Sequence, residues 1–104
     1  MKITRVQYTL KPDFVEQNKK NIEAVMRELR ALNNADIKYA TYVLEDGKTF
    51  MHLAHYNVTE VESLLTSLAS FRNFQSQLKD HFEIPPKVES LELVQSSFEM
   101  FQHA

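Results

Sequence analysis

The sequence predicts one small α+β domain with the element order βαββαβ. Three observations carry this prediction: short segments of alternating polarity, two longer segments with helical periodicity, and an Asp46-Gly47 turn in the middle of the chain. The chain has 104 residues, of which 43% are hydrophobic and 25% charged, a composition that suits one packed core. We therefore expect a single domain over residues 1–104, built on a four-stranded antiparallel sheet.

The first strand and the first helix follow from the N-terminal third. Polar and apolar side chains alternate over residues 3–10, which is the period of a strand. Pro12 stops the ladder of hydrogen bonds, and Asp13 with Glu16 predicts a capped helix start. Apolar residues then recur at close to 3.6-residue spacing, so we expect this helix to run to about Asn33.

A hairpin is predicted in the middle of the chain. The apolar segments 37–44 and 49–56 flank Asp46-Gly47, and Asp-Gly between two such segments is typical of a two-residue hairpin turn. The turn sets the register, so that Thr41 lies opposite His52.

The last third predicts a second helix and a fourth strand. Thr59 and Glu62 form a capping-box pattern, and an apolar stripe follows it up to Pro85-Pro86. One continuous helix is therefore expected before the prolines. The segment 88–101 alternates imperfectly and is interpreted as the fourth strand with an extended tail.

One face of this sheet should need a partner molecule. Two helices can cover one face of a four-stranded sheet, and both faces of the predicted hairpin are mostly apolar. Burying four or five large side chains per subunit, at about 1.5 to 3 kcal/mol each, is enough to drive association. A homodimer through the open sheet face is the simplest solution.

Polar side chains guide the choice of the open face. Against helices, unpaired polar groups are costly, whereas a wet cavity tolerates them. We therefore assign one set of residues to the helix side and another to the open face. The helix-side set is Val6, Tyr8, Leu10, Ala40, Tyr42, Leu44, Met51 and Leu53, and the open-face set is Arg5, Gln7, Tyr39, Thr41, Phe50, His52 and Tyr56.

Composition excludes several classes of function. There is no cysteine, so neither a disulfide framework nor thiolate chemistry exists. Residues 1–6 lack the apolar region of a signal peptide and no apolar window is long enough to span a membrane, which predicts a cytoplasmic protein without a membrane partner. A net charge of −2 with intermixed signs disfavours nucleic acid as a partner.

Metal and nucleotide cofactors are not expected. His52 and His55 are three residues apart on a strand, so they point to opposite faces and cannot share a metal ion. His81 and His103 are predicted to be solvated. Gly47 is the single glycine, so the chain has no glycine-rich phosphate loop.

The chain resembles the dimeric α/β-barrel superfamily of ferredoxin-like domains, and within it the antibiotic-biosynthesis-monooxygenase-like group. The resemblance covers nearly the whole chain and rests on fold markers. They are Leu10-Lys11-Pro12, Ala35-Asp36-Ile37-Lys38-Tyr39, Phe50 to Tyr56, the stretch Leu65 to Phe74, and Val88-Glu89-Ser90-Leu91. It implies a homodimer whose two sheets face each other, with a pocket between each sheet and its surrounding loops and helices.

The superfamily includes cofactor-independent oxygenases that act on polycyclic aromatic or quinol-like substrates, heme-degrading enzymes, isomerases and dehalogenases, so membership does not select a reaction. Heme degradation is disfavoured by departures from that branch's pattern, an Asn on the first strand and a Trp and a His on the second helix. This chain has no Trp, has Arg5 and Gln7 in mid-strand, and runs Phe74-Gln75-Ser76 at the matching stretch of helix.

His52 and Arg5 are the candidate catalytic residues. In mid-strand on a cavity face, His52 could act as a general base, and its structural alternative is a histidine hydrogen-bonded to Thr41 or Tyr39. Arg5 could stabilise an oxyanion, or it could pair with a carboxylate across a dimer.

The remaining candidates are expected to bind substrate, and they are Gln7, Tyr39, Thr41, Phe50 and Tyr56. Gln7 could orient a carbonyl or anionic group. Tyr39 and Tyr56 could stack on an aromatic substrate, although aromatic residues on strands more often belong to the core. A small hydrophobic or aromatic molecule is therefore the expected ligand.

Three functions compete at this point. The first is a monooxygenase-like enzyme that works without metal or flavin on a small aromatic or quinol-like substrate. The second is a non-catalytic ligand-binding or stress-associated dimer. The third is an RNA-binding βαββαβ module, which the mild negative charge and the lack of a Lys/Arg-Gly-aromatic signature disfavour.

Overall fold

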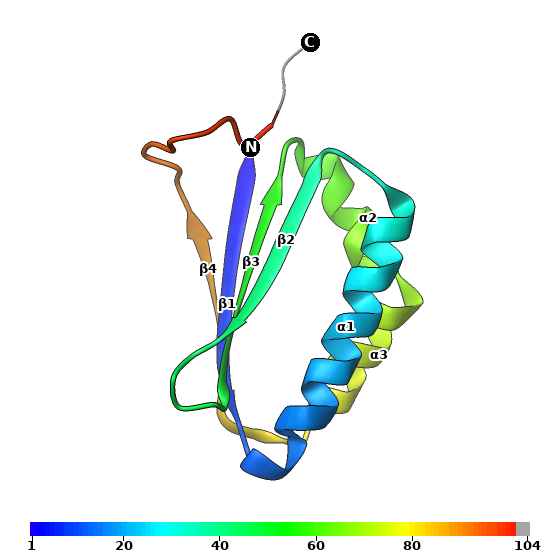
Figure 1. Cartoon of the computed structure of the whole chain (residues 1–104), viewed down its shortest axis with the longest axis vertical. Coiled ribbons are helices and arrows are strands. Elements are labelled where there is room, and N and C mark those ends of the chain that lie inside the picture. Colours follow the sequence, from blue (N-terminus) through cyan, green and yellow to red (C-terminus); the bar gives the residue numbers. More distant parts are fainter. Residues whose placement is uncertain (102–104) are drawn as a thin grey trace.

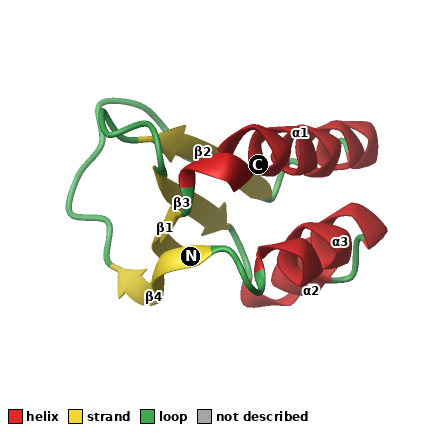
Figure 2. Cartoon of the chain, turned by 90° about the horizontal axis from the view of Figure 1, so that it is seen from below, coloured by secondary structure: helices red, strands yellow, loops and turns green. Residues whose placement is uncertain are grey.

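Four antiparallel strands form one sheet in the order β2-β3-β1-β4, and the helices pack on one of its faces (Figures 1 and 2). The computed structural model describes residues 1–101. The elements are β1 (Lys2–Leu10), α1 (Val15–Leu32), β2 (Ile37–Val43), β3 (Thr49–Tyr56), α2 (Glu62–Thr66), α3 (Ala69–Leu78) and β4 (Phe82–Leu91), with short 3-10 turns at Pro12–Phe14 and Thr59–Val61. The predicted ferredoxin-like βαββαβ order is therefore confirmed.

The first helix ends where the sequence predicts and begins differently. Its last residue is followed by Asn33, which adopts a left-handed conformation with φ 50° and so closes the helix. The predicted cap is wrong, because Asp13 lies inside the 3-10 turn and makes no side-chain capping bond. The turn instead carries the chain from β1 into α1.

The hairpin has the predicted register but a longer loop. Thr41 lies opposite His52, as predicted, and Leu44 donates its backbone N–H to the Thr49 carbonyl at 2.8 Å. Residues 45–48 form the loop, in which the Asp46 carboxylate accepts hydrogen bonds from the backbone N–H groups of residues 48 and 49. Gly47, with φ 73°, takes the left-handed conformation that the turn requires.

The second helix is not continuous, contrary to prediction. It breaks into α2 and α3 at Ser67–Leu68, where Leu68 is extended. The hydroxyls of Thr66 and Ser67 bond back to carbonyls of the preceding turn, a competition that weakens helices. The capping box is also absent, because Thr59 lies in a 3-10 turn and Val58 precedes it without a side-chain cap.

The fourth strand begins earlier than predicted, at Phe82, and it contains both prolines. An edge strand tolerates proline, because one row of its N–H groups needs no partner in the sheet. Shifts in the pairing register between Gln7 and Leu10 of β1 accommodate the interruption. The segment 92–101 continues past the strand without regular structure.

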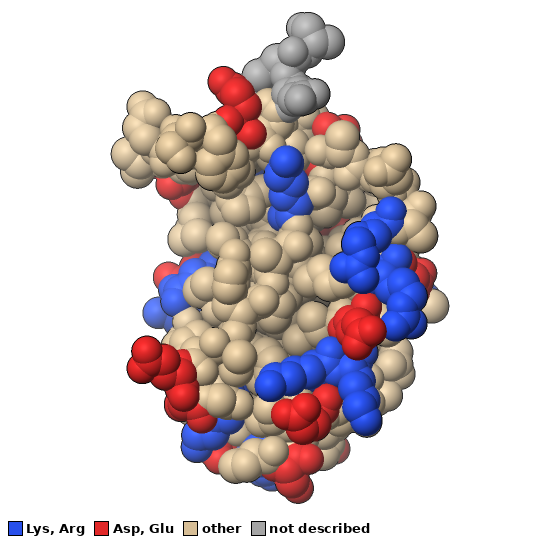
Figure 3. Space-filling model, viewed as in Figure 1, with Lys and Arg blue, Asp and Glu red and all other residues tan. Residues whose placement is uncertain are grey.

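The core lies between the sheet and the helices. Its fully buried members include Tyr8, Leu10, Val25, Phe50 and Leu65. In the view of Figure 3, side chains of both signs alternate over the helical side, and no broad patch of one sign forms there. Among residues 1–101, none of the helices is long and apolar enough to cross a membrane.

Candidate functional site

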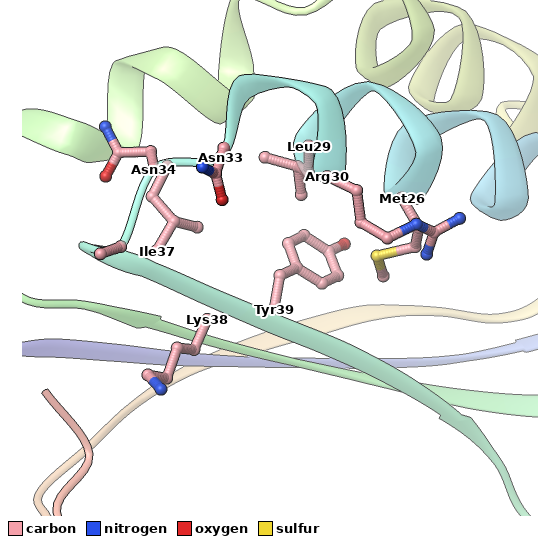
Figure 4. Close-up of a pocket in the computed structure, with 9 residues that line it drawn as sticks. Met26, Leu29, Arg30, Asn33, Asn34, Ile37, Lys38 and Tyr39 are labelled. Atoms are coloured by element: carbon pink, nitrogen blue, oxygen red, sulfur yellow. The ribbon is translucent and has the colours of Figure 1, made fainter.

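The pairing of β1 with β3 decides which side chains share a face of the sheet. Val6 lies opposite His52, and Tyr8 lies opposite Phe50, so these residues all point toward the helices. Burial along β3 agrees, since Phe50, His52, Ala54 and Tyr56 are buried and the residues between them are partly exposed. In Figure 4, Tyr39 points from β2 toward α1 while Lys38 points to the opposite face.

The predicted open face is therefore wrong for the hairpin. Tyr39, Thr41, Phe50, His52 and Tyr56 lie on the helix side, whereas Arg5 and Gln7 alone of the predicted set lie on the open face. Conversely, Ala40, Tyr42, Leu44, Met51 and Leu53 belong to the open face and not to the helix side. The structure separates the two candidate catalytic residues by the thickness of the sheet.

The physical reason is that the polar residues of the hairpin satisfy one another. His52 is only 5% exposed, and both of its ring nitrogens have hydroxyl partners. Nε2 lies 2.7 Å from the Tyr8 hydroxyl, and Nδ1 lies 2.6 Å from the Tyr39 hydroxyl and 3.2 Å from that of Thr41. Because their hydrogen bonds are made, these groups can be buried at little cost.

One further residue completes this polar cluster. Asn18 of α1 is fully buried, and its Nδ2 donates to the Tyr8 hydroxyl at 2.9 Å. A line of hydrogen bonds thus runs from Asn18 through Tyr8 and His52 to Tyr39 and Thr41. We call these five residues the His52 cluster.

A cavity of about 290 Å³ adjoins the His52 cluster. Tyr8, Tyr39 and His52 form its polar end, and Gln75 of α3 adds an amide. The remaining walls are apolar and come mainly from α3 and β4, namely Phe71, Phe74, Leu78, Phe82 and Val88. Val88 is 66% exposed, which places the mouth at the β4 edge of the sheet. The cavity lies between the sheet and the helices, on the side opposite to the open face where the sequence predicts it.

Aromatic rings line the cavity around and beside His52. The ring centroids of His52 and Phe74 are 5.3 Å apart, and those of Tyr8 and Phe82 are 5.6 Å apart in an edge-on arrangement. Such walls suit a flat apolar ligand. Because about 150 Å³ suffices for one benzene ring, the cavity has room for a ligand of about two rings.

Burial shapes the ionisation of the cluster. Desolvation lowers the pKa of His52 to about 4, so the imidazole is neutral at physiological pH. Desolvation also raises the pKa of Tyr8 and of Tyr39 well above that of an exposed tyrosine. All of these groups are therefore uncharged at neutral pH, and they act as hydrogen-bond donors and acceptors.

The low pKa of His52 predicts a stability that falls in acid. The unfolded chain binds a proton on this histidine below about pH 6.5, whereas the folded protein does so only near pH 4. Stability therefore rises with pH across this window, by up to about 3 kcal/mol from His52. Urea unfolding at pH 7 and pH 4 should show a larger loss for the wild type than for His52→Gln. Equal losses would contradict the buried, neutral histidine.

Arg5 and Gln7 make a separate group on the open face. Arg5 Nη1 bonds to Glu89 Oε1 of β4 at 3.0 Å, and its Nε approaches the Met51 sulfur at 3.2 Å. Within the protomer, the carboxylate that pairs with Arg5 thus comes from the same chain, and a pairing across a dimer stays a prediction. Both members of the pair are about one-third exposed in the protomer.

Two predicted ligand-binding residues belong to the core. Phe50 stacks on Tyr8 with ring centroids 5.7 Å apart, and it does not line the cavity. Tyr56 is 3% exposed at the far end of β3 and likewise lies away from the cavity, and burial raises its pKa to about 12. The packing alternative therefore holds for both residues.

Tyr8, Asn18 and the aromatic residues of α3 were missed as site residues. Asn18 carried a usable signal, since it lies three residues after Val15 and seven before Val25, on the apolar stripe of α1. A polar residue at a core position points to a buried hydrogen bond. Tyr8 gave no such signal, because a tyrosine on a strand is typical core.

The remaining histidines offer no metal site. Among residues 1–101, no group of three or more His, Asp or Glu side chains is arranged to hold a metal ion. His81 is partly exposed and stacks on Phe14 with ring centroids 3.9 Å apart. His103 lies outside the described residues.

A larger hollow of about 600 Å³ lies between the end of α1 and β2 (Figure 4). Met26, Leu29, Arg30 and Ile37 line it, together with Tyr39, which therefore borders both hollows. The smaller cavity is the better candidate, because several buried polar groups converge there on one point.

No family model matches the sequence, and the search of curated proteins found no significant match to it. Solved structures do share its fold. A Bacteroides thetaiotaomicron protein named provisionally as an antibiotic biosynthesis monooxygenase superposes with a TM-score of 0.81 at 7% identity, covering 94% of this chain and 93% of its own. A provisionally so named protein from Nitrosomonas europaea gives 0.76 at 14% identity, with 91% and 100% covered.

A third structure, from Mycobacterium tuberculosis, has a name that states no activity. It superposes with a TM-score of 0.76 at 15% identity, covering 93% of this chain and 98% of its own. At such low identities, the likeness establishes the fold and leaves the activity to the site itself.

Proposed function

We propose that this chain, which has the ferredoxin-like fold of the antibiotic-biosynthesis-monooxygenase-like structures, binds a small aromatic phenol or quinol in the cavity beside His52 and oxidises it with molecular oxygen. The observation that carries the proposal is one apolar cavity with a single polar end, built from Tyr8, Tyr39 and His52. Cavities of this composition hold an apolar ligand and fix the position of its one polar atom.

The aromatic walls and the size of the cavity support this ligand class. The rings of Phe71, Phe74 and Phe82 can enclose the face and edge of a two-ring ligand. Its hydroxyl oxygen would then lie at the polar end, within reach of the His52 cluster. No charged side chain lines the cavity, which favours a neutral ligand over an acidic or basic one.

The proposed reaction balances without a further reductant. A phenol with hydrogen on the para carbon reacts with one O₂ to give the para-quinone and one water molecule. One oxygen atom forms the new carbonyl, and the other leaves as water with the two hydrogens lost from the O–H and C–H bonds. The phenol loses four electrons and O₂ gains four. The chain's part is to orient the ligand oxygen and to hold its proton through the His52 cluster.

Oxygen uptake with 1-naphthol tests this proposal, because this two-ring phenol yields 1,4-naphthoquinone and water in the same balance. We expect one O₂ to be consumed per quinone formed, at a rate proportional to protein concentration. Binding of 1-naphthol without oxygen uptake would contradict the oxidation and support a non-catalytic ligand-binding role. Absence of binding would overturn the proposed site.

A non-catalytic binding role is the second candidate, and one observation favours it. Both ring nitrogens of His52 already have hydroxyl partners in the protein, at 2.7 Å and 2.6 Å, so a ligand would have to compete with these partners to bond the imidazole directly. In that case the cluster only forms a hydrogen bond with the polar atom of a ligand. The oxygen electrode separates the two roles.

We also propose that the protein works as a homodimer through its open sheet face. That face exposes Tyr42 by 51% and Leu44 by 40%, and it adds Ala40, Met51 and Leu53 as partly exposed apolar residues. Arg5 and Glu89 on the same face carry opposite charges, so a two-fold related copy can meet it without net repulsion. Figure 2 shows the helices on the other face of the sheet.

A further inference from the structure

We propose that Asn18 is a positioning residue that fixes the hydrogen on Nδ1 of His52, so that the Tyr39 hydroxyl presents its hydrogen to the cavity. The ligand atom at the polar end must then be a hydrogen-bond acceptor, such as a phenol or carbonyl oxygen. This inference rests on the proposed function for its ligand, although the direction of the hydrogen bonds is a property of the protein alone.

Asn18 is an unexpected residue where it lies. It is fully buried on the apolar stripe of α1, and its Oδ1 has no hydrogen-bond partner among residues 1–101. A buried amide with an unpaired oxygen weakens a fold compared with an apolar side chain of the same size. The residue is therefore poorly explained by stability, and its one bond, to the Tyr8 hydroxyl, is the feature that calls for a role.

The direction of the hydrogen bonds follows from counting hydrogens. Asn18 Nδ2 can only donate, so the Tyr8 oxygen accepts from it at 2.9 Å. The Tyr8 hydroxyl hydrogen is then best used toward His52 Nε2, 2.7 Å away. Nε2 is thereby the acceptor nitrogen, and in a neutral imidazole the hydrogen must lie on Nδ1.

At the other end of the cluster, one hydroxyl hydrogen is then left without an acceptor within the cluster. Nδ1–H donates toward the Tyr39 oxygen at 2.6 Å, with Thr41 at 3.2 Å. The two hydroxyls keep two hydrogens of their own, and Nδ1 no longer accepts either of them. Thr41 can accept one from Tyr39 or donate one to it, so one hydrogen stays available. When Thr41 donates, that hydrogen belongs to Tyr39, which is the one of these two hydroxyls that lines the cavity.

The opposite direction would move the available hydrogen to the other tyrosine. If Nδ1 were the acceptor, Tyr39 would donate to it, Nε2–H would donate to the Tyr8 oxygen, and the Tyr8 hydroxyl would keep the hydrogen that faces the cavity. The direction set by Asn18 therefore selects which of the two tyrosines donates to the ligand. A donor hydroxyl in a cavity of low dielectric also stabilises the negative charge that develops on a phenol oxygen as its proton leaves.

The nitrogen NMR spectrum of the histidine side chains tests this inference without any ligand. In protein labelled with ¹⁵N-histidine, the wild type should show His52 with its hydrogen on Nδ1 in at least about nine molecules of ten, since a preference of about 1.4 kcal/mol gives tenfold. Asn18→Leu should spread the hydrogen over both nitrogens and should leave the melting temperature unchanged or raised. Asn21→Leu is the matched control, because Asn21 is also buried on α1 and bonds to Gln17 and Gln77 instead.

The outcomes separate this inference from the proposed function. A wild-type His52 with its hydrogen on Nε2 would overturn the inference, as would an Asn18→Leu variant that melts lower with an unchanged tautomer, since Asn18 would then be structural. With the tautomer as expected, oxygen uptake from 1-naphthol should fall at least about tenfold in Asn18→Leu and stay near wild type in Asn21→Leu. An expected tautomer without any uptake in the wild type would count against the proposed function alone.

Discussion

Replacing His52 with glutamine should lower the rate of oxygen uptake with 1-naphthol by about 10²- to 10⁴-fold, the usual contribution of a group that moves a proton. Glutamine keeps one donor and one acceptor near Tyr8 and Tyr39, so it preserves part of the hydrogen bonding at this buried position. It cannot take up a proton. The expected loss is therefore in kcat more than in KM, which oxygen-electrode kinetics over a range of 1-naphthol concentrations would measure.

His55→Gln is the matched control for this experiment. His55 lies three residues further along β3, on the opposite face of the sheet and away from the cavity. The variant should keep a rate within about twofold of the wild type, because surface changes far from a site have small effects. Equal losses in both variants, or no loss in His52→Gln, would remove the histidine from the proposed mechanism.

Replacing Tyr42 with arginine should turn the dimer into a monomer at micromolar concentration. Tyr42 is 51% exposed in the protomer and points to the open face, so the change leaves the protomer's own packing nearly intact. In a two-fold dimer it places two new charges in an apolar interface, where like charges cost several kcal/mol. The dissociation constant should rise by at least about 10²-fold, as measured by analytical ultracentrifugation.

Val43→Arg serves as the comparison. Val43 is the next residue of β2, it is 41% exposed, and it points to the helix side of the sheet. The same charge on the same edge strand should leave the dimer intact. A wild type that is already monomeric would contradict the proposed dimer, and dissociation of both variants would show that the interface does not follow the face of the sheet.

The fold followed from the sequence where local signals were strong. The Asp46-Gly47 turn fixed the β2–β3 register, and the apolar period fixed α1 and its end at Asn33. Breaks caused by weaker effects were not predictable. Hydroxyl groups that compete for backbone carbonyls interrupted the second helix at Ser67, and an edge position allowed Pro85 and Pro86 inside β4.

The face of the sheet on which the polar hairpin residues lie could not be predicted from the hairpin sequence alone. His52, Tyr39 and Thr41 looked too polar to face helices, and that reasoning fails because Tyr8 and Asn18 supply their missing partners. Those two partners come from β1 and α1, far away in sequence. The pairing of Val6 with His52 is a long-range property that no local pattern contains.

Chemical-shift mapping shows directly whether the ligand binds on the helix side of the sheet. Titration of 1-naphthol into ¹⁵N- and ¹³C-labelled protein should shift the signals of Tyr8, His52, Phe74 and Val88, which line the cavity. Signals of the open face, at Arg5, Tyr42 and Leu53, should stay in place. Shifts confined to those open-face residues would contradict binding beside His52, because they would place the ligand between the two sheets of a dimer.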